Sequence, residues 1–123
     1  MQLDGFVAEV VVREPSMSSP YTRLVVPTRG FRTDEDRRRH FYKHGADFSC
    51  VTSAQYERQA DEFLGGPLPS SAAECTRPGG GSVRYNETTR EFGVLHADGF
   101  IATYLRLTGT VAHCRQVFAD NCE

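Results

Sequence analysis

The stretch SVRYNETTREFGVLHADGFIATYLRL, residues 82–107, decides the fold. It holds three short segments rich in Val, Ile, Phe and Tyr, and turn residues separate them, which predicts three strands. The predicted strands are 82–85, 91–95 and 100–107. Asp98-Gly99 is a strong hairpin signal, because these residues favour the tight turn between antiparallel strands. The stretch therefore predicts an antiparallel meander.

Two helices are predicted before this meander. Thr33 is a good N-cap for a helix that ends at His44, because acidic residues fill its first turn and Gly45 follows it. A second helix is expected from about residue 54 to residue 64, and Gly65-Gly66-Pro67 ends it. Helices followed by a meander predict an α+β fold in which the two helices pack on one face of the sheet.

The segments outside these elements are harder to assign. Residues 1–32 are expected to form a strand pair, at 6–12 and 21–26, or a connector, and residues 33–123 to form the main domain. Residues 65–82 are rich in Gly, Pro and Ser and are expected to form a loop, while a short helix is expected at 111–118.

The composition is that of an ordinary globular protein. The 123 residues are 39% hydrophobic and 24% charged, which excludes a disordered, collagen-like or coiled-coil chain. The longest apolar run, Val10–Val12, is far too short to cross a membrane, and no basic-then-apolar leader begins at Met1. Because the net charge is -2, binding to a nucleic acid would need a local basic patch.

Four cysteines give no metal-binding pattern, since none of them forms a CxxC pair. They are Cys50, Cys75, Cys114 and Cys122. A chain of this length does not need disulfides, so four free thiols are favoured over two bridges. A cysteine nucleophile is a third, weaker reading.

The densest group of reactive side chains is RRRHFYKHG, residues 37–45. On a helix, His40 and His44 lie one turn apart on the same face, with Lys43 beside them. Imidazole titrates near neutral pH, so the pair suits acid–base catalysis at a phosphate. The same spacing suits zinc, although no third ligand is evident. A solvated basic helix end is the alternative without function.

The meander carries a second group of polar side chains. Arg84 and Asn86 point to one face of a strand, because side chains alternate along it. Thr103, Tyr104 and Arg106 lie together on the last strand. These donors suit a phosphate site, and the alternative is the polar outer face that antiparallel sheets commonly have.

Three segments, in this order along the chain, resemble a family of bacterial toxin nucleases. They are RHFYKHGADF (39–48), SAQYERQADEFL (53–64) and ECTRPGGGSVRYNETTREFGVLHADGFIATYLRL (74–107). The family is the barnase–EndoU–colicin–RelE-like group, found in contact-dependent inhibition systems and as C-terminal domains of polymorphic toxins. The likeness covers residues 37–107 and implies a fold of two helices on a β-meander.

The resemblance implies a metal-independent endoribonuclease without a cofactor. Such an enzyme attacks a phosphate with the neighbouring 2′-hydroxyl of RNA, often tRNA, and leaves a 2′,3′-cyclic phosphate. It acts as a monomer in the bacterial cytoplasm, is either a C-terminal domain delivered as part of a larger secreted toxin or a small stand-alone protein, and is held in check by an immunity or antitoxin protein. The catalytic positions implied are His40, Lys43, His44, Arg84, Thr103 and Tyr104. The residues expected to bind the RNA are Arg37, Arg77, Asn86 and Arg106.

Two other functions stay open at this point. The chain can be a non-enzymatic relative that kept the fold and binds RNA or a protein partner. It can also be a regulatory domain that binds a metal ion through His40 and His44. Cleavage of RNA that survives a chelator separates these alternatives from a ribonuclease.

Overall fold

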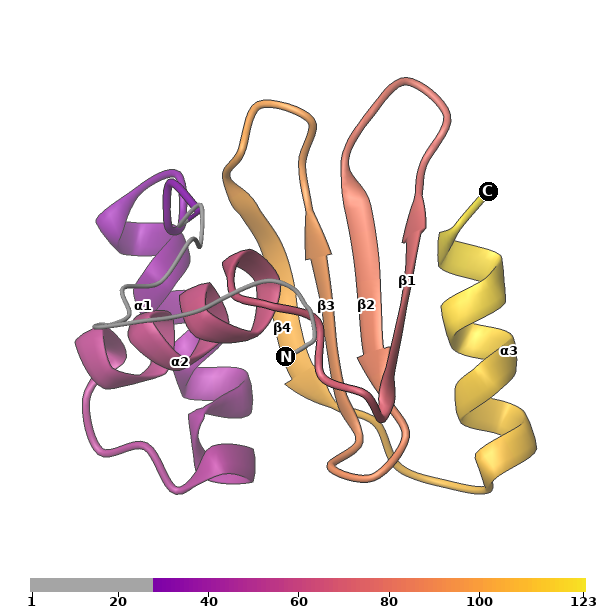
Figure 1. Ribbon diagram of the computed structural model, residues 1–123. Helices are drawn as coiled ribbons and strands as arrows, with labels where there is room; N and C mark the ends of the chain where they lie inside the picture. Colours follow the sequence, from indigo (N-terminus) through magenta and orange to yellow (C-terminus); the bar gives the residue numbers. More distant parts are fainter. Residues whose placement is uncertain (1–27) are drawn as a thin grey trace, which may run out of the picture.

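The computed structural model describes residues 28–123, which form three helices, one 3₁₀ turn and four strands (Figure 1). The helical elements are α1 (Asp34–His44), η1 (Gly45–Phe48), α2 (Ser53–Gly65) and α3 (Val111–Asn121). The strands are β1 (Ala72–Thr76), β2 (Ser82–Asn86), β3 (Glu91–Leu95) and β4 (Ile101–Arg106). The strands form one sheet in the order β1-β2-β3-β4, and every neighbouring pair is antiparallel. The predicted α+β fold, with helices on an antiparallel meander, is confirmed.

The sheet lies between two helical layers (Figure 1). Helices α1 and α2 cover one face, and α3 covers the other face, which the sequence analysis did not anticipate. The core under α1 and α2 consists of Phe31, Tyr56, Ala60, Phe63, Leu64, Ile101 and Tyr104. The core under α3 consists of Val83, Tyr85, Phe92, Val94 and Cys114. Two separate cores therefore hold the sheet from both sides.

A threonine immediately before each helix caps its N-terminus. The hydroxyl oxygens of Thr33, Thr52 and Thr110 accept a hydrogen bond from the backbone N–H three residues later, at 3.0, 3.0 and 3.1 Å. Such a cap satisfies one of the four N–H groups that a helix start leaves unpaired. The predicted starts and ends of α1 and α2 are confirmed within about two residues, the usual uncertainty of a helix end.

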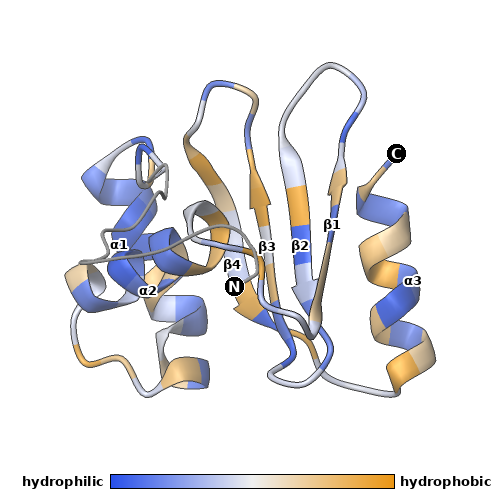
Figure 2. Ribbon diagram, in the orientation of Figure 1, coloured by the Kyte–Doolittle hydropathy of each residue, from blue (hydrophilic) through white to orange (hydrophobic). Residues whose placement is uncertain are grey.

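The two helices on the first face differ in how they pack. Figure 2 shows α1 as mostly hydrophilic, and none of its residues is buried. Helix α2 instead buries one apolar face against the sheet. It comes close to β3 because Gly93 has no side chain there: a Cβ at this position would lie 2.9 Å from a methyl group of Leu64.

The prediction of a loop over residues 65–82 was wrong in its middle part. Strand β1 lies there, at Ala72–Thr76, and pairs with β2 over its whole length. Its sequence, AAECT, lacks the β-branched and aromatic residues that mark most strands. An edge strand that is mostly exposed needs few such residues, since it packs on little and pairs along one side only.

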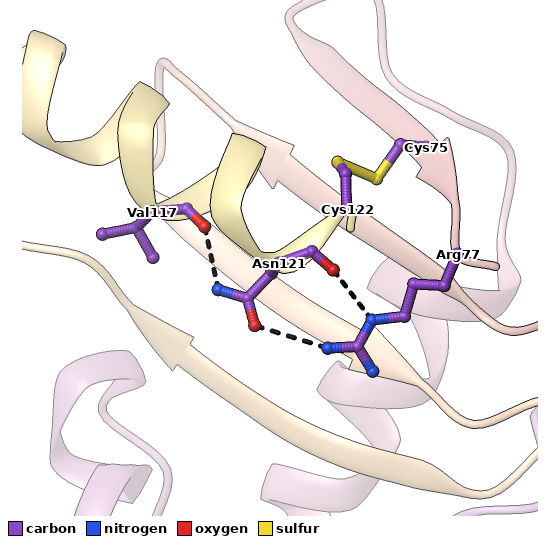
Figure 3. The surroundings of a disulfide bond; sticks show 5 residues. All are labelled: Cys75, Arg77, Val117, Asn121 and Cys122. Atoms are coloured by element: carbon purple, nitrogen blue, oxygen red, sulfur yellow. Dashed lines mark hydrogen bonds between the residues drawn. A yellow bond between two sulfur atoms is a disulfide. The ribbon is translucent and has the colours of Figure 1, made fainter.

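The preference for four free thiols was also wrong, because Cys75 and Cys122 form a disulfide (Figure 3). This bond joins β1 to the residue that follows α3. Arg77 supports the same junction, since its Nε donates to the backbone carbonyl of Asn121 at 2.8 Å. Cys50 and Cys114 remain free.

The strands expected at 6–12 and 21–26 lie outside the described residues. The first described segment, residues 28–31, lies against the sheet: the N–H of Arg29 donates to the carbonyl of Gly99 at 2.8 Å. Phe31 forms a single parallel bridge with Ile101. Over residues 28–123, none of the helices combines the length and the apolar character that a membrane crossing requires.

Candidate functional site

His40 and His44 lie on α1, which packs against the edge strand β4. Both imidazoles are partly exposed, and their ring centroids are 6.4 Å apart. The ring of His40 stacks on Phe31, with a centroid distance of 5.0 Å and an interplanar angle of 24°. The predicted pair therefore exists on one helix face, and one of its members has a fixed ring orientation.

Phe31 is itself anchored by contacts with α2. Its ring stacks on Tyr56 at 5.8 Å, and its N–H donates to the Glu57 carboxylate at 2.9 Å. Glu57 also lies 3.5 Å from Arg37 of α1. Sequence reasoning missed Phe31 and Glu57, because the contact joins residues from three segments that no local pattern relates.

Burial lowers the pKa of both histidines below the ordinary value of 6.5. For His40 the positive charges of Arg39, Lys43 and a protonated His44 add to this effect, and Asp36 opposes it. For His44 the carboxylate of Asp47, 3.8 Å from Nδ1, opposes it. The lowered pKa favours the neutral form of each ring, which can accept a proton, and Asp47 favours the protonated form of His44, which can give one.

The nitrogens of His40 have different surroundings. Nδ1 is buried and has no hydrogen-bond partner among residues 28–123. Because His40 as a whole is partly exposed, we expect a substrate to reach the ring from the Nε2 side. His40 thus offers one edge of its ring for proton transfer.

The lowered pKa values predict how stability depends on pH. The unfolded chain binds protons at these histidines more readily than the folded chain does, so acid favours unfolding. We expect the free energy of unfolding to fall as the pH drops below 6.5. Urea titrations at several pH values should show a smaller fall for a His40→Ala/His44→Ala double variant. The control is His113→Ala at an exposed position, and its free energy of unfolding should fall with pH as much as that of the parent. A double variant that loses as much stability in acid as the parent would contradict the role of His40 and His44.

Tyr104 is built into the core. Its side chain is fully buried, and its hydroxyl donates to the Glu91 carboxylate at 2.5 Å and accepts from Gln59 at 3.2 Å. Burial and the neighbouring Glu91 raise the pKa of the phenol above its ordinary value. Tyr104 therefore stays protonated at neutral pH and serves the packing of α2 on β4.

Thr103 faces the other layer. It pairs with Val94, which belongs to the core under α3, whereas Tyr104 pairs with Gly93 under α2. Directly paired residues share a face of an antiparallel sheet. The structure thus places Thr103 on the face away from His40.

Arg84 is only 9% exposed and points toward α2. Its Nη1 donates to the backbone carbonyls of Phe63 and Gly66 at 2.9 and 2.7 Å, and its Nε donates to Glu74 at 2.8 Å. A cation suits the end of a helix, where carbonyls lack partners. The sequence analysis expected Arg84 on a polar sheet face that a phosphate or solvent could reach. This is wrong, because helices cover both faces of the sheet and the Arg84 guanidinium is hydrogen-bonded to Phe63, Gly66 and Glu74.

This arrangement predicts that Arg84→Met destabilises the fold. The change leaves carbonyls at the end of α2 and the carboxylate of Glu74 without their partner, so the free energy of unfolding should fall by about 2–3 kcal/mol. Urea titration measures the fall. The matched control is Arg115→Met, which removes an exposed pair with Glu87 and should cost less than about 1 kcal/mol. Equal effects of the two variants would contradict this role for Arg84.

The remaining predicted residues have separate places. Arg37 pairs with Asp34 and Glu57, and Lys43 is exposed near the end of α1. Arg77 holds the end of α3. The buried side chain of Asn86 accepts hydrogen bonds from two backbone N–H groups in the β2–β3 turn. The guanidinium of Arg106 lies over the ring of Phe48, 5.0 Å from its centroid.

The structure therefore keeps the predicted site residues of α1 together, whereas the predicted site residues of the strands lie in separate places. His40, Lys43 and His44 share the exposed part of α1, while Arg84, Asn86 and Tyr104 serve the fold. Among residues 28–123, no three His, Cys, Asp or Glu side chains are grouped so that they could hold a metal ion. Comparison with protein-family models and with curated proteins finds no match to this chain.

Proposed function

We propose that the protein is a metal-independent endoribonuclease toxin whose reaction takes place at α1. The observation that carries this proposal is the pair formed by His40 and His44: two partly exposed imidazoles on one helix face, both with a lowered pKa. Such a pair supplies an acid and a base for phosphoryl transfer to an internal hydroxyl. The resemblance of residues 37–107 to toxin ribonucleases supports the same reaction.

We assign His40 the role of base and His44 the role of acid. Burial, Arg39, His44 and Lys43 favour the unprotonated form of His40 against the effect of Asp36, whereas Asp47 favours the protonated form of His44. His40 would take the proton of a ribose 2′-hydroxyl, whose oxygen then attacks the adjacent phosphorus. The bond from phosphorus to the leaving 5′-oxygen breaks, and a protonated His44 gives that oxygen its proton. The products are a 2′,3′-cyclic phosphate and a free 5′-hydroxyl.

Lys43 supplies the charge for this step. It follows His40 and precedes His44 in the sequence of α1, and its side chain is exposed. The phosphorane that forms during attack carries extra negative charge, which a nearby ammonium stabilises. We propose this role for Lys43 and leave Arg84 and Tyr104 in the structural roles described above.

The direct test is incubation of the pure protein with total tRNA in EDTA. Discrete fragments are expected, and their yield should not change when the chelator concentration rises. Absence of cleavage with every RNA tried would favour the non-enzymatic relative, which binds RNA or a protein partner without cutting. Cleavage that EDTA abolishes would favour a metal-dependent site instead.

The toxin assignment has its own test. Expression of the chain alone in a sensitive bacterium should stop growth, and co-expression of an acidic immunity protein should restore it. The on-rate of that partner should fall as salt rises, because charges at the rim of an interface steer encounter. The disulfide between Cys75 and Cys122 is typical of proteins that pass through an oxidising compartment, which fits secretion. Normal growth of cells that express the parent would contradict the toxin assignment.

A further inference from the structure

Two arginine side chains from the segment that contains Phe31 lie over one aromatic ring. The guanidinium carbons of Arg29 and Arg32 lie 4.3 and 4.4 Å from the centroid of the Phe100 ring. Both distances are within the range of cation–π attraction. We call Arg29, Arg32 and Phe100 the Arg–Phe cluster; it lies at the start of β4.

The cluster is held in place by the turn between β3 and β4. The backbone N–H of Arg29 donates to the carbonyl of Gly99 at 2.8 Å, and the guanidinium of Arg32 donates to Asp98 at 2.8 Å. Gly99 has a φ of 93°, and a Cβ there would lie 3.2 Å from the stem of Arg29. Both arginines are therefore partly ordered before any ligand binds, which lowers the entropy lost on binding.

Counted over residues 28–123, the cluster carries more positive than negative charge. Within the described residues, the carboxylate that pairs with it is Asp98, against the two guanidinium groups of Arg29 and Arg32. A guanidinium presents a planar fork that fits two phosphate oxygens, and its flat face stacks with nucleobases. A phosphate-bearing, base-containing ligand matches both properties.

The position of the cluster links it to the proposed reaction. Phe31 lies between Arg29 and Arg32 in the chain, and its ring stacks on His40. An extended chain spans at most about 3.5 Å per residue, so the Cα atoms of both arginines lie within about 7 Å of that of Phe31. The segment that carries both arginines therefore also carries the residue on which His40 stacks.

A cavity of about 370 Å³ adjoins the cluster, lined by residues 28–30 and by α2. Arg29 and Arg58 contribute to its wall. Its two carboxylates, Glu57 and Asp61, each accept a hydrogen bond from a backbone N–H within residues 28–31. The volume is at the lower end of the range for small-molecule sites, which is enough for one nucleotide.

We propose that the Arg–Phe cluster is an RNA subsite that holds the nucleotide next to the scissile phosphate. The guanidinium forks of Arg29 and Arg32 bind its phosphate, and its base lies toward the adjoining cavity. This inference rests on the proposed ribonuclease function, because RNA is the ligand that brings a phosphate and a base to the neighbourhood of His40.

The test is the binding of a fluorescein-labelled, eight-nucleotide 2′-O-methyl RNA, measured by anisotropy at several salt concentrations. This probe cannot be cleaved by the proposed reaction, since its 2′-oxygen carries a methyl group in place of the proton. The variants are Arg29→Ala, Arg29→Ala/Arg32→Ala and Phe100→Leu. The matched control is Arg115→Ala on α3, where the arginine pairs with Glu87.

The parent should bind the probe with a salt slope that becomes shallower by about 0.7 for each phosphate contact removed. Because both guanidinium groups hold the same phosphate, the double variant should lose about 0.7 in slope and bind at least 10-fold more weakly, while Arg115→Ala keeps the parent's affinity. If the double variant fails to fold, the single variant Arg29→Ala still tests the subsite, because it leaves the ion pair between Arg32 and Asp98 intact.

Equal affinity and slope in the parent and the Arg29 variants would overturn the subsite, as would absence of probe binding by the parent. These failures are distinct from failure of the proposed function. A parent that binds the probe through the cluster and cleaves no RNA keeps the subsite and loses the enzyme. A parent that cleaves RNA equally well with and without the arginines keeps the enzyme and loses the subsite.

Discussion

Replacement of His40 by alanine is expected to slow RNA cleavage by about 10²- to 10⁴-fold, the usual effect of removing a general base. The side chain is partly exposed near the middle of α1, and alanine is the better helix former. Loss of its stacking on Phe31 removes some packing, but α1 buries none of its residues, so the fold should survive. Cleavage rates on a defined RNA and circular dichroism of the same samples measure both effects.

Two further variants make this result specific. His113→Ala removes an exposed histidine from α3, which lies on the opposite layer of the sheet, and should leave the rate unchanged. His40→Gln keeps a polar side chain against Phe31 without a titrating group, and should be as inactive as the alanine variant. A His40→Ala protein that melts earlier yet cleaves at the parent's rate would make His40 structural and leave His44 as the candidate base.

Removal of the disulfide is expected to destabilise the protein by about 4 kcal/mol. Cys75 and Cys122 are separated by 47 positions, and a crosslink over a loop of this length restricts the unfolded chain strongly. The double variant Cys75→Ser/Cys122→Ser tests this in urea titrations without a reductant. The parent in dithiothreitol should show the same loss, since reduction opens the same loop.

The matched control for this change is Cys50→Ser. Cys50 is a free cysteine beside α2, and its thiol makes only long contacts, such as 3.6 Å to Gln59. The Cys50→Ser change should alter the free energy of unfolding by less than about 1 kcal/mol. Identical unfolding curves for the oxidised parent and the disulfide variant would contradict the proposed contribution of the bond.

Local signals in the sequence were enough to predict most of the helices and strands. Thr33 and Gly45 delimit α1, and Asp98-Gly99 marks the hairpin between β3 and β4, because caps and tight turns depend on residues a few positions apart. Strand β1 has no such signal. It becomes a strand by pairing with β2, and a pairing partner is not visible in a short window of sequence.

The same contrast between local and long-range signals applies to the candidate site. The spacing of His40 and His44 predicts a shared helix face, since the period of a helix is known in advance. The alternation along β2 correctly places Arg84 and Asn86 on one face, but it does not say what covers that face. The end of α2 covers Arg84, and only the folded chain brings it there.

Long-range partners also explain what the sequence could not give for Phe31, the residue on which His40 stacks. Phe31 reaches this position through Glu57 and Ile101, which lie 26 and 70 residues away in the chain. The Arg–Phe cluster depends on the same approach of residues 28–32 to the β3–β4 turn. Single residues in an unassigned segment therefore became candidates only once the fold was known.

The chemistry of the fragment ends tests the central claim most directly. Total tRNA is digested by the parent in EDTA, and the new 3′ ends are treated with enzymes that distinguish a 2′,3′-cyclic phosphate from a 3′-phosphate or a 3′-hydroxyl. The proposed reaction predicts cyclic phosphates at the new 3′ ends and free hydroxyls at the new 5′ ends, both absent from digests with His40→Ala. Fragments with 5′-phosphates and 3′-hydroxyls would instead mean that water attacked the phosphorus, and would contradict the mechanism assigned to α1.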